Sequence, residues 1–386
     1  MTVSRADRSS FAVWWWTTDR LAFSAVIALV AIGLMLAFAA SPAATGSANA
    51  AGDFRFAAKQ IAFAGVALII LLFTSALSLK AVKLSAAVVF ALALIGSTLV
   101  LFTGGEVWGA KRWIDFGWMT LQPSEFLKPG FAVLGAAILA DKAKMILPKE
   151  LITFLLVLPA LVVLILQNDV GQTGLLLALW GALLFFNGAS LAATGALAGG
   201  TAGLGVLAYF FEGHVRHRVE QYLSHDKSGG GGYQTDLALK AFAHGGWTGV
   251  GPGAGTVKYH IPEAHSDFIF AVAGEEYGLV LCGAIAALFC VLTVRLLLRS
   301  ARGRDSFSSL CGAGLATVVA LQAFINMGVA TSLLPAKGMT LPFISYGGSS
   351  LFAVALTMGY ALSVTRQRSK IGEREHQMFG FLKEAT

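Results

Sequence analysis

Charged residues are scarce in this sequence, at 13% of 386 residues, whereas a soluble protein usually contains about 25%. Cysteines are scarcer still: Cys282, Cys290 and Cys311 all lie in apolar runs without metal-ligand spacing, so we expect neither disulfides nor a zinc site. No Gly-x-Ser-x-Gly nucleophile motif and no Walker sequence is present. Despite a net charge of +7, no basic and aromatic binding module stands out, so we expect no nucleic-acid partner.

What the sequence has instead is apolar residues, at 56% of the chain, with a mean hydropathy of +0.72. They form solid runs of about 20 residues, the length that crosses a bilayer as a helix, and not the alternating segments of about ten residues typical of a β-barrel. We therefore predict an all-α, polytopic membrane protein with ten transmembrane helices and one large periplasmic loop, 213–261, between spans 7 and 8. The predicted spans are 21–41, 57–78, 84–103, 124–140, 151–167, 172–188, 191–211, 267–294, 309–333 and 346–365.

Basic residues predict the orientation of these spans, because short cytoplasmic loops collect Lys and Arg. One side collects basic residues from both termini and from three loops, among them Arg5, Lys80, Lys142, Arg295, Arg299 and Arg368. That side is predicted to be cytoplasmic, so residues 1–20 and 367–386 are cytoplasmic tails of a ten-span domain at 21–366. The N-terminus lacks a small-residue cleavage site, so we expect it to be retained.

Three acids lie near the start of the eighth predicted span, where charge is costly. Pro262 suits the first turn of a helix, which would set Asp267 about one turn inside it, at the external boundary of the membrane. Asp267 is then either an interfacial acid that stabilises the helix N-terminus or a general base at the edge of a cavity. Glu275 and Glu276 lie deeper, and are either functional or simply hydrogen-bonded to neighbouring helices.

Three basic residues are predicted on the same external face as the first acid. Lys111, Arg112 and Lys128 are either cations that snorkel to the interface or binders of a phosphate-bearing substrate. Glu125 precedes Lys128 by one helical turn, so the two share a face and can pair.

Three further polar or glycine-rich stretches are predicted to face the same compartment. Asp169 ends the cluster Gln167-Asn168-Asp169 at the external end of the fifth span. Ser345 opens the last predicted span, and this helix entry is either an anion site or a plain cap. The glycine-rich stretch 249–255 lacks the context of a Rossmann loop, and we interpret it as a mobile cover over a lipid-linked sugar.

Four motifs in this order make nearly the whole chain resemble the SEDS family (shape, elongation, division and sporulation). They are Lys111-Arg112-Trp113-Ile114, Gln122-Pro123-Ser124-Glu125, Pro262–Ala271 followed by Gly274-Glu275-Glu276, and Leu341–Ser349. Within the family, the stretch Pro335–Pro342, with its Lys337, is similar to the FtsW branch. The resemblance implies a ten-span peptidoglycan glycosyltransferase that polymerises lipid II in septal cell-wall synthesis. It also implies Asp267 as the essential acid and a class B penicillin-binding protein, an FtsI-type transpeptidase, as partner.

The residues fit an inverting transfer in which Asp267 deprotonates the acceptor hydroxyl as general base. Cations would stabilise the departing undecaprenyl diphosphate, and whether a divalent cation, Mg²⁺ or Mn²⁺, assists them is left open. The predicted substrate-binding residues are Lys111, Arg112, Gln122, Ser124, Glu125, Lys128, Asp169, His265, Lys337 and Ser345.

Three alternatives stay open at this point. The chain could be a lipid II flippase whose path is lined by Glu275, Glu276 and Lys59, an elongation-type polymerase similar to RodA, or a non-catalytic scaffold. On the preferred hypothesis we expect a protein of the inner (cytoplasmic) membrane, at the division septum, with its active site facing the periplasm. Divisome proteins and membrane lipid would be its further partners.

Overall fold

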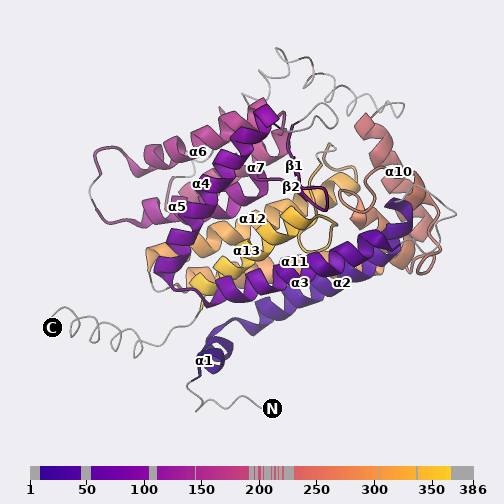
Figure 1. Ribbon diagram of the computed structural model, residues 1–386, viewed down its shortest axis with the longest axis horizontal. Helices are drawn as coiled ribbons and strands as arrows, with labels where there is room; N and C mark the ends of the chain where they lie inside the picture. The colour runs from indigo at the N-terminus through magenta and orange to yellow at the C-terminus, as the bar shows by residue number, and fades with distance from the viewer. Residues whose placement is uncertain are drawn as a thin grey trace.

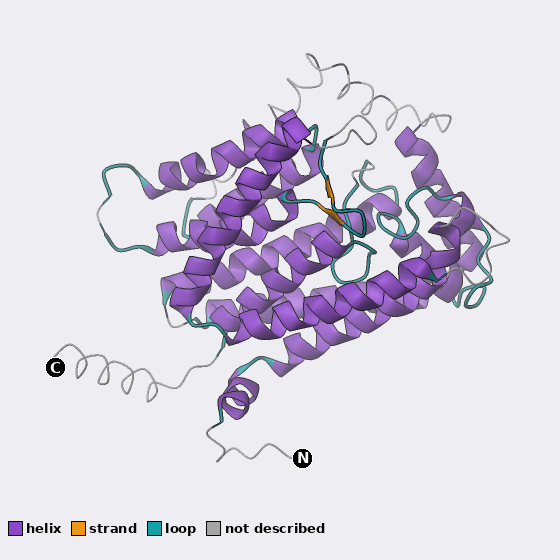
Figure 2. Ribbon diagram, viewed as in Figure 1, coloured by secondary structure: helices purple, strands orange, loops and turns teal. Residues whose placement is uncertain are grey.

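The computed structural model describes residues 9–44, 54–103, 111–143, 145–190, 230–303, 305–335 and 338–366, with a few isolated positions between 191 and 229. These residues form a helical bundle (Figures 1 and 2). The elements are α1 Ser10–Thr17, α2 Arg20–Ala44, α3 Arg55–Ala76, α4 Leu79–Thr103, β1 Ile114–Asp115, β2 Thr120–Leu121, α5 Ser124–Ala140, α6 Lys149–Leu166, α7 Val170–Phe186, α10 Gly230–Gly245, the 3₁₀ helix η1 Val257–His260, α11 Ile269–Ala301, α12 Ser306–Ala330 and α13 Gly348–Val364.

The predicted spans match these helices closely, and the all-α prediction is confirmed. Span 124–140 coincides with α5, because the apolar run begins after Pro123 and ends where Asp141 adopts an extended backbone. The seventh predicted span, 191–211, lies outside the described residues apart from isolated positions, so the count of ten stays a prediction.

Several helices have the length and composition of membrane spans. Among the described residues, α2, α3, α4, α6, α11 and α12 are long and apolar enough to cross a bilayer, and α7 and α13 are apolar but shorter. The outer faces of α3 and α4 expose large apolar side chains, among them Phe73, Leu84 and Phe102. Such faces would be costly in water, whereas in a bilayer they meet lipid tails.

Two arginines that the sequence places in a cytoplasmic loop lie inside α11 instead. Arg295 and Arg299 each hold Nε 2.7 Å from Oδ2 of Asp19, which is buried at the start of α2. The paired charges let the helix continue to Ala301, past the predicted end at 294.

A small hairpin between α4 and α5 was not predicted. Strands β1 and β2 are antiparallel, with Ile114 opposite Leu121 and Asp115 opposite Thr120. The hairpin returns the chain on itself, so that Arg112, just before β1, and Gln122, just after β2, both reach the start of α7. In Figure 1 the hairpin and α10 lie at the end of the bundle away from α1.

Helix α11 is broken at Gly278, whose φ of 77° and ψ of −179° are not helical. A break frees backbone groups that need partners when buried, and the preceding glycine-rich loop supplies them. The N–H groups of Leu279 and Val280 donate to the carbonyls of Gly246 and Trp247, and the carbonyls of Glu275 and Glu276 accept from Val250 and Gly251. At Gly249 a Cβ would lie 2.1 Å from the carbonyl oxygen of Glu276, so only glycine fits. Residues 250 and 251 of the loop are thus bonded to α11, and a mobile cover over a lipid-linked sugar stays a prediction.

Candidate active site

Asp267 lies in a series of turns, residues 262–268, that precedes α11. Glu263 has a left-handed backbone, with φ of 55°, and its carbonyl accepts the N–H groups of residues 266–268 at 3.1 to 3.3 Å. The helix therefore begins only after this turn. The prediction that Pro262 opens the helix, with Asp267 one turn inside it, was wrong because Glu263 reverses the backbone first.

As a whole residue Asp267 is partly exposed, and its carboxylate accepts no hydrogen bond from the residues that the structure describes. Its position is fixed through the main chain, since its carbonyl accepts a bond from Nδ2 of Asn326 at 2.8 Å. Desolvation raises the pKa of Asp267 to about 7, with a further rise from Glu263 and an opposing effect from Arg112. A carboxyl group with a pKa near neutrality can both accept and release a proton at physiological pH.

Arg112 connects the hairpin segment to the start of α7. Its Nη2 donates to the carbonyl of Asn168 at 2.5 Å, and its Nε lies 3.8 Å from Oδ2 of Asp169. The same carboxylate oxygen accepts a bond from Nε2 of Gln122 at 3.3 Å. Burial raises the pKa of Asp169, against the lowering effect of Arg112. The charge of Arg112 thus acts on two carboxylates, Asp169 and Asp267.

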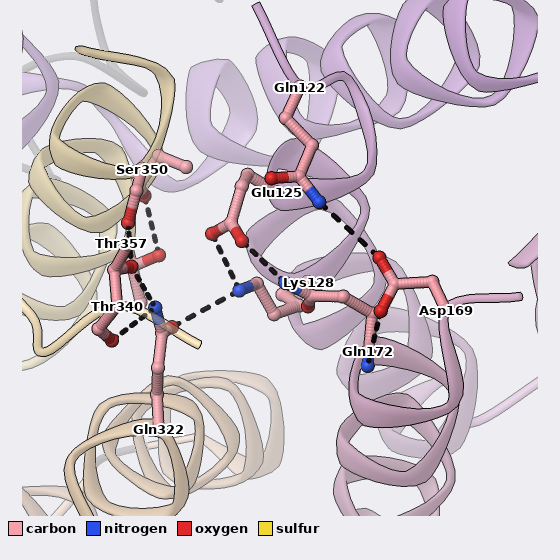
Figure 3. Close-up of polar contacts among 10 residues, drawn as sticks. Gln122, Glu125, Lys128, Asp169, Gln172, Gln322, Thr340, Ser350 and Thr357 are labelled. Carbon is pink, nitrogen blue, oxygen red and sulfur yellow. Dashed lines mark hydrogen bonds and ion pairs between the residues drawn. The ribbon is translucent and has the colours of Figure 1, made fainter. Parts of the chain in front are cut away.

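Lys128 and Glu125 form the ion pair that their spacing predicts, inside the bundle. Nζ of Lys128 lies 2.7 Å from Oε2 of Glu125, and the two residues are 2% and 3% exposed. Lys128 also donates to Oε1 of Gln322 on α12 at 3.1 Å, and Glu125 accepts from Nε2 of Gln172 on α7 at 2.5 Å (Figure 3). The network joins three helices and keeps the ammonium group of Lys128 away from the surface.

Helix α12 connects this network to the Asp267 turn through two amides, Gln322 and Asn326. Gln322 donates to the carbonyl and to the hydroxyl of Thr340, both at 3.3 Å. One turn further on, Asn326 donates to the carbonyls of Asp267 and Met339 at 2.8 and 2.6 Å. Four residues of helix span about 6 Å. The ion pair of α5 and the Asp267 turn are therefore neighbours in one site.

Ser345 fastens the segment before α13 to the Asp267 turn. Its hydroxyl donates to the carbonyl of Ser266 at 2.5 Å and accepts the N–H of Leu341 at 2.7 Å. Its carbonyl accepts a bond from Nε2 of Gln60 on α3 at 3.1 Å. The hydroxyl of Ser345 is therefore hydrogen-bonded to the main chain and stabilises the turn. A contact between Ser345 and substrate stays a prediction.

His265 packs beside two aromatic rings next to the same turn. Its ring centroid lies 5.0 Å from that of Phe56 and 5.4 Å from that of Tyr346. Burial lowers the pKa of His265, against the raising effect of Glu263, so the neutral imidazole is favoured. A neutral ring can still exchange hydrogen bonds with a sugar hydroxyl.

The remaining predicted substrate-binding residues are unevenly placed. Lys111 is partly exposed beside Arg112, at the entrance to the hairpin. Ser124 is buried in the first turn of α5, and its hydroxyl has no hydrogen-bond partner within the described part of the chain. Lys337 lies outside the described residues.

Three amides that hold the site together were missed at the sequence level: Gln172, Gln322 and Asn326. Gln322 and Asn326 interrupt the otherwise apolar predicted span 309–333 and Gln172 opens the span 172–188, and a polar side chain at membrane depth needs a partner. Gln322 and Asn326 are also one helical turn apart and so share a face. That pattern was the signal that could have identified them.

Glu275 and Glu276, at the broken end of α11, are fully buried and bonded within the protein. Glu275 accepts three successive backbone N–H groups, those of residues 256–258, at 2.7 to 2.9 Å. Glu276 pairs with Nζ of Lys258, which is 1% exposed and also donates to a carbonyl of α2 at 2.7 Å. Of the two alternatives for these acids, hydrogen bonding to neighbouring segments is what the structure shows.

Comparison with known proteins places these residues in a family. The sequence model of the FtsW/RodA/SpoVE family, described as "Cell cycle protein", matches residues 19–370. The chain belongs to this family. Together with the six long apolar helices, membership confirms a multi-pass membrane protein.

Two curated members of the FtsW/RodA/SpoVE family show how close the similarity is. A protein of Caulobacter vibrioides (strain NA1000 / CB15N), named "Probable peptidoglycan glycosyltransferase FtsW", is 40% identical over 95% of this chain and 93% of its own length. A protein of the same name from Idiomarina loihiensis (strain ATCC BAA-735 / DSM 15497 / L2-TR) is 32% identical over 92% and 89%.

Solved structures of the family share the fold. A chain from the work "Structural coordination of polymerization and crosslinking by a peptidoglycan synthase complex" aligns with a TM-score of 0.74 at 26% identity, covering 90% of this chain and 97% of that one. The crystal structure of the rod shape determining protein RodA of Thermus thermophilus aligns with a TM-score of 0.67 at 26% identity, covering 92% and 99%.

Proposed function

We propose that this chain is a peptidoglycan glycosyltransferase that polymerises lipid II, an undecaprenyl-diphosphate-linked disaccharide-pentapeptide, with Asp267 as general base. The observation that carries the proposal is Asp267, a partly exposed residue whose carboxylate accepts no hydrogen bond from the described residues and has a pKa raised by desolvation to about 7. The names of the curated relatives and the similar chain of a peptidoglycan synthase complex support the same activity.

The proposed reaction is a single inverting displacement. The acceptor hydroxyl gives its proton to Asp267 as its oxygen bonds to the anomeric carbon of the donor sugar. The bond from that carbon to the diphosphate oxygen breaks, and its electron pair leaves with the undecaprenyl diphosphate. An α-linked donor then gives a β-linked product without a covalent enzyme intermediate. A general base in this position typically contributes about 10²–10⁴-fold to the rate.

Arg112 and Lys111 are the cations best placed to meet the diphosphate, since both are partly exposed. A guanidinium group can bind two phosphate oxygens at once, and Arg112 is already oriented by its bond to the carbonyl of Asn168. Preorganised charge of this kind stabilises a leaving group without further rearrangement. Lys128 is buried against Glu125, so we assign this pair to the support of α5 and not to direct contact with phosphate.

The proposal extends to location and partners. The basic loops favour an inner-membrane protein with both termini in the cytoplasm and Asp267 facing the periplasm, at the division septum. We propose a class B penicillin-binding protein of the FtsI type as the partner, and divisome proteins and membrane lipid as further contacts. A divalent cation, Mg²⁺ or Mn²⁺, would add charge stabilisation at the diphosphate. The described residues contain no group of three or more His, Cys, Asp or Glu side chains that could hold a metal ion, so we assign no ligand to it.

A proteoliposome assay tests the proposal. The purified chain, with its partner and with lipid II in the outer leaflet, should form glycan polymer, and the Asp267→Ala variant should form none. Movement of lipid II between leaflets without polymer would contradict the proposal and favour a flippase. The structure gives a flippase path little support, because Glu275 and Glu276 are bonded internally and Lys59 lies on the exposed face of α3.

A localisation experiment distinguishes division from elongation. A tagged chain that gathers at midcell supports the septal role. A distribution along the side wall would favour an elongation-type enzyme similar to RodA.

A further inference from the structure

Glu263 determines the shape of the turn that carries Asp267. Its backbone is left-handed, which is uncommon for a residue with a side chain. This conformation points its carbonyl at three successive N–H groups, those of residues 266–268, at 3.1 to 3.3 Å. The N–H of Asp267 is the middle one of the three. The main chain of the acid is thus fixed by the residue one turn earlier.

The side chain of Glu263 contacts two neighbours in the same turn. Its Oε2 accepts the hydroxyl of Ser266 at 2.7 Å and lies 3.7 Å from Nε2 of His265. The carboxylate is about half exposed and lines a cavity of about 300 Å³ that also includes Tyr259 and His260. An exposed carboxylate avoids the desolvation cost of carrying charge.

The groups near the turn 262–268 come from four segments. Among the described residues, Glu263 and His265 belong to the turn itself, Arg112 of the hairpin segment acts on Asp267 by its charge, Tyr346 before α13 packs beside the ring of His265, and Asn326 on α12 donates to the carbonyl of Asp267. Two of these act on the proton affinity of Asp267 in opposite directions: Glu263 raises its pKa and Arg112 lowers it. Arg112 lies close to the carboxylate of Asp169 as well, whereas the contacts of the Glu263 carboxylate within the described part of the chain are a hydroxyl and an imidazole.

We propose that Glu263 is a positioning residue of the glycosyl transfer site: its carbonyl fixes the turn that presents Asp267, and its carboxylate keeps a negative charge beside that acid. This inference rests on the function proposed above. A general base works best when its pKa is close to the working pH, and a like charge nearby disfavours ionisation of an acid. The backbone and the charge of Glu263 therefore both prepare Asp267 to act as a base. Different substitutions can remove the one contribution without the other.

The charge is tested by pH profiles of kcat/KM for lipid II polymerisation by the full chain with its partner. Asp267 is active only when deprotonated, so the rate falls on the acid side, through the pKa of Asp267. Glu263→Gln removes the like charge and should move this acid limb to lower pH by about half a unit, the order of magnitude of one charge acting through a water-like dielectric. Glu263→Asp should restore the wild-type limb.

The matched control is Glu150→Gln, an exposed acid in the first turn of α6, which should leave the limb in place. If Glu263→Gln lowers the rate equally at every pH, the charge of Glu263 has no effect on the ionisation of Asp267. The electrostatic role proposed for Glu263 is then overturned. A shift in Glu150→Gln of the same size would overturn it as well, because the effect would then not be local.

The backbone is tested by Glu263→Gly against Glu263→Val, with thermal unfolding of both measured in detergent. Glycine adopts positive φ without strain, whereas a β-branched residue does not. Glu263→Gly should therefore keep most of the activity and show the shifted limb of Glu263→Gln, while Glu263→Val should lose at least about tenfold at all pH values. Equal rates in the two variants would overturn the proposal that the left-handed backbone of Glu263 positions Asp267.

Different results would overturn the proposed function and the inference about Glu263. If Asp267→Asn polymerises lipid II at the wild-type rate, the proposed function itself is wrong. If Asp267→Asn is inactive and the acid limb of Glu263→Gln does not move, only the inference about Glu263 is wrong.

Discussion

Asp267 and Glu275 lie on one stretch of chain and have opposite surroundings. Glu275 is fully buried, and its two oxygens accept the backbone N–H groups of residues 256–258. Asp267 is partly exposed, and its oxygens accept no bond from the described residues. A carboxylate with its lone pairs occupied holds a fold together, whereas an unoccupied one with a raised pKa can take a proton. Between Asp267 and Glu275, the occupancy of the carboxylate oxygens distinguishes the candidate base from the structural acid.

The difference arises from the backbone that faces each acid. Glu275 faces the start of η1, where N–H groups of a helix end are free to donate. Asp267 follows a turn whose N–H groups, its own included, are already used by the carbonyl of Glu263. The first acid is therefore supplied with donors, and the second is not.

Lys258→Ala should give the largest effect on the structural side of this comparison. It would leave Glu276 buried without its cation, which typically costs about 3–5 kcal/mol. The thermal unfolding midpoint in detergent should fall sharply. The matched control is Lys240→Ala, which removes a lysine paired with Asp236 on the exposed face of α10 and should change little. Equal midpoints for the two variants would break the comparison.

Glu275→Gln should have a smaller effect of the same kind. The amide presents an NH₂ group to backbone donors, so at least one of the N–H groups at 256–258 loses its acceptor, at a cost of about 1–3 kcal/mol. We expect a lower unfolding midpoint with polymerisation per folded molecule within about twofold of wild type. Loss of activity at an unchanged midpoint would make Glu275 a participant in the chemistry.

The wild-type pH dependence should show the smallest of these effects, and it tests the role of Asp267 as the base. The pKa of Asp267 is raised to about 7, and the base is competent only above that value. Between pH 7 and pH 6, kcat/KM should therefore approach a tenfold fall per unit, about 1.4 kcal/mol, as the carboxylate is protonated. The unfolding midpoint is measured over the same range to show that the protein stays folded. A flat profile down to pH 5 would contradict a general base of this pKa.

The fold was largely predictable from the sequence, because long apolar runs can cross a bilayer only as helices. The boundaries that failed did so for local reasons. The two arginines of α11 both pair with Asp19, which is far away in sequence, and the start of α11 is delayed by the backbone of Glu263. Hydropathy predicts neither an ion pair between residues that are distant in sequence nor the backbone conformation of a single residue.

The candidate site was predictable in part. The spacing of Glu125 and Lys128 gives their ion pair directly, and that prediction is confirmed. The hairpin that directs Arg112 towards Asp169 depends on pairing between strands of two residues each, which is too short a signal to detect. The hydrogen bonds between the glycine loop and α11 depend on a helix break at Gly278. A single glycine in an apolar run is not enough to predict such a break.

The most direct test of the central claim is the rate of lipid II polymerisation by Asp267→Asn and Glu275→Gln, measured side by side with the unfolding midpoint of each. Asp267→Asn should lose about 10²–10⁴-fold in rate at an unchanged midpoint. Glu275→Gln should keep its rate per folded molecule at a lowered midpoint. An active Asp267→Asn variant, or a stable and inactive Glu275→Gln variant, would contradict the assignment of Asp267 as the base.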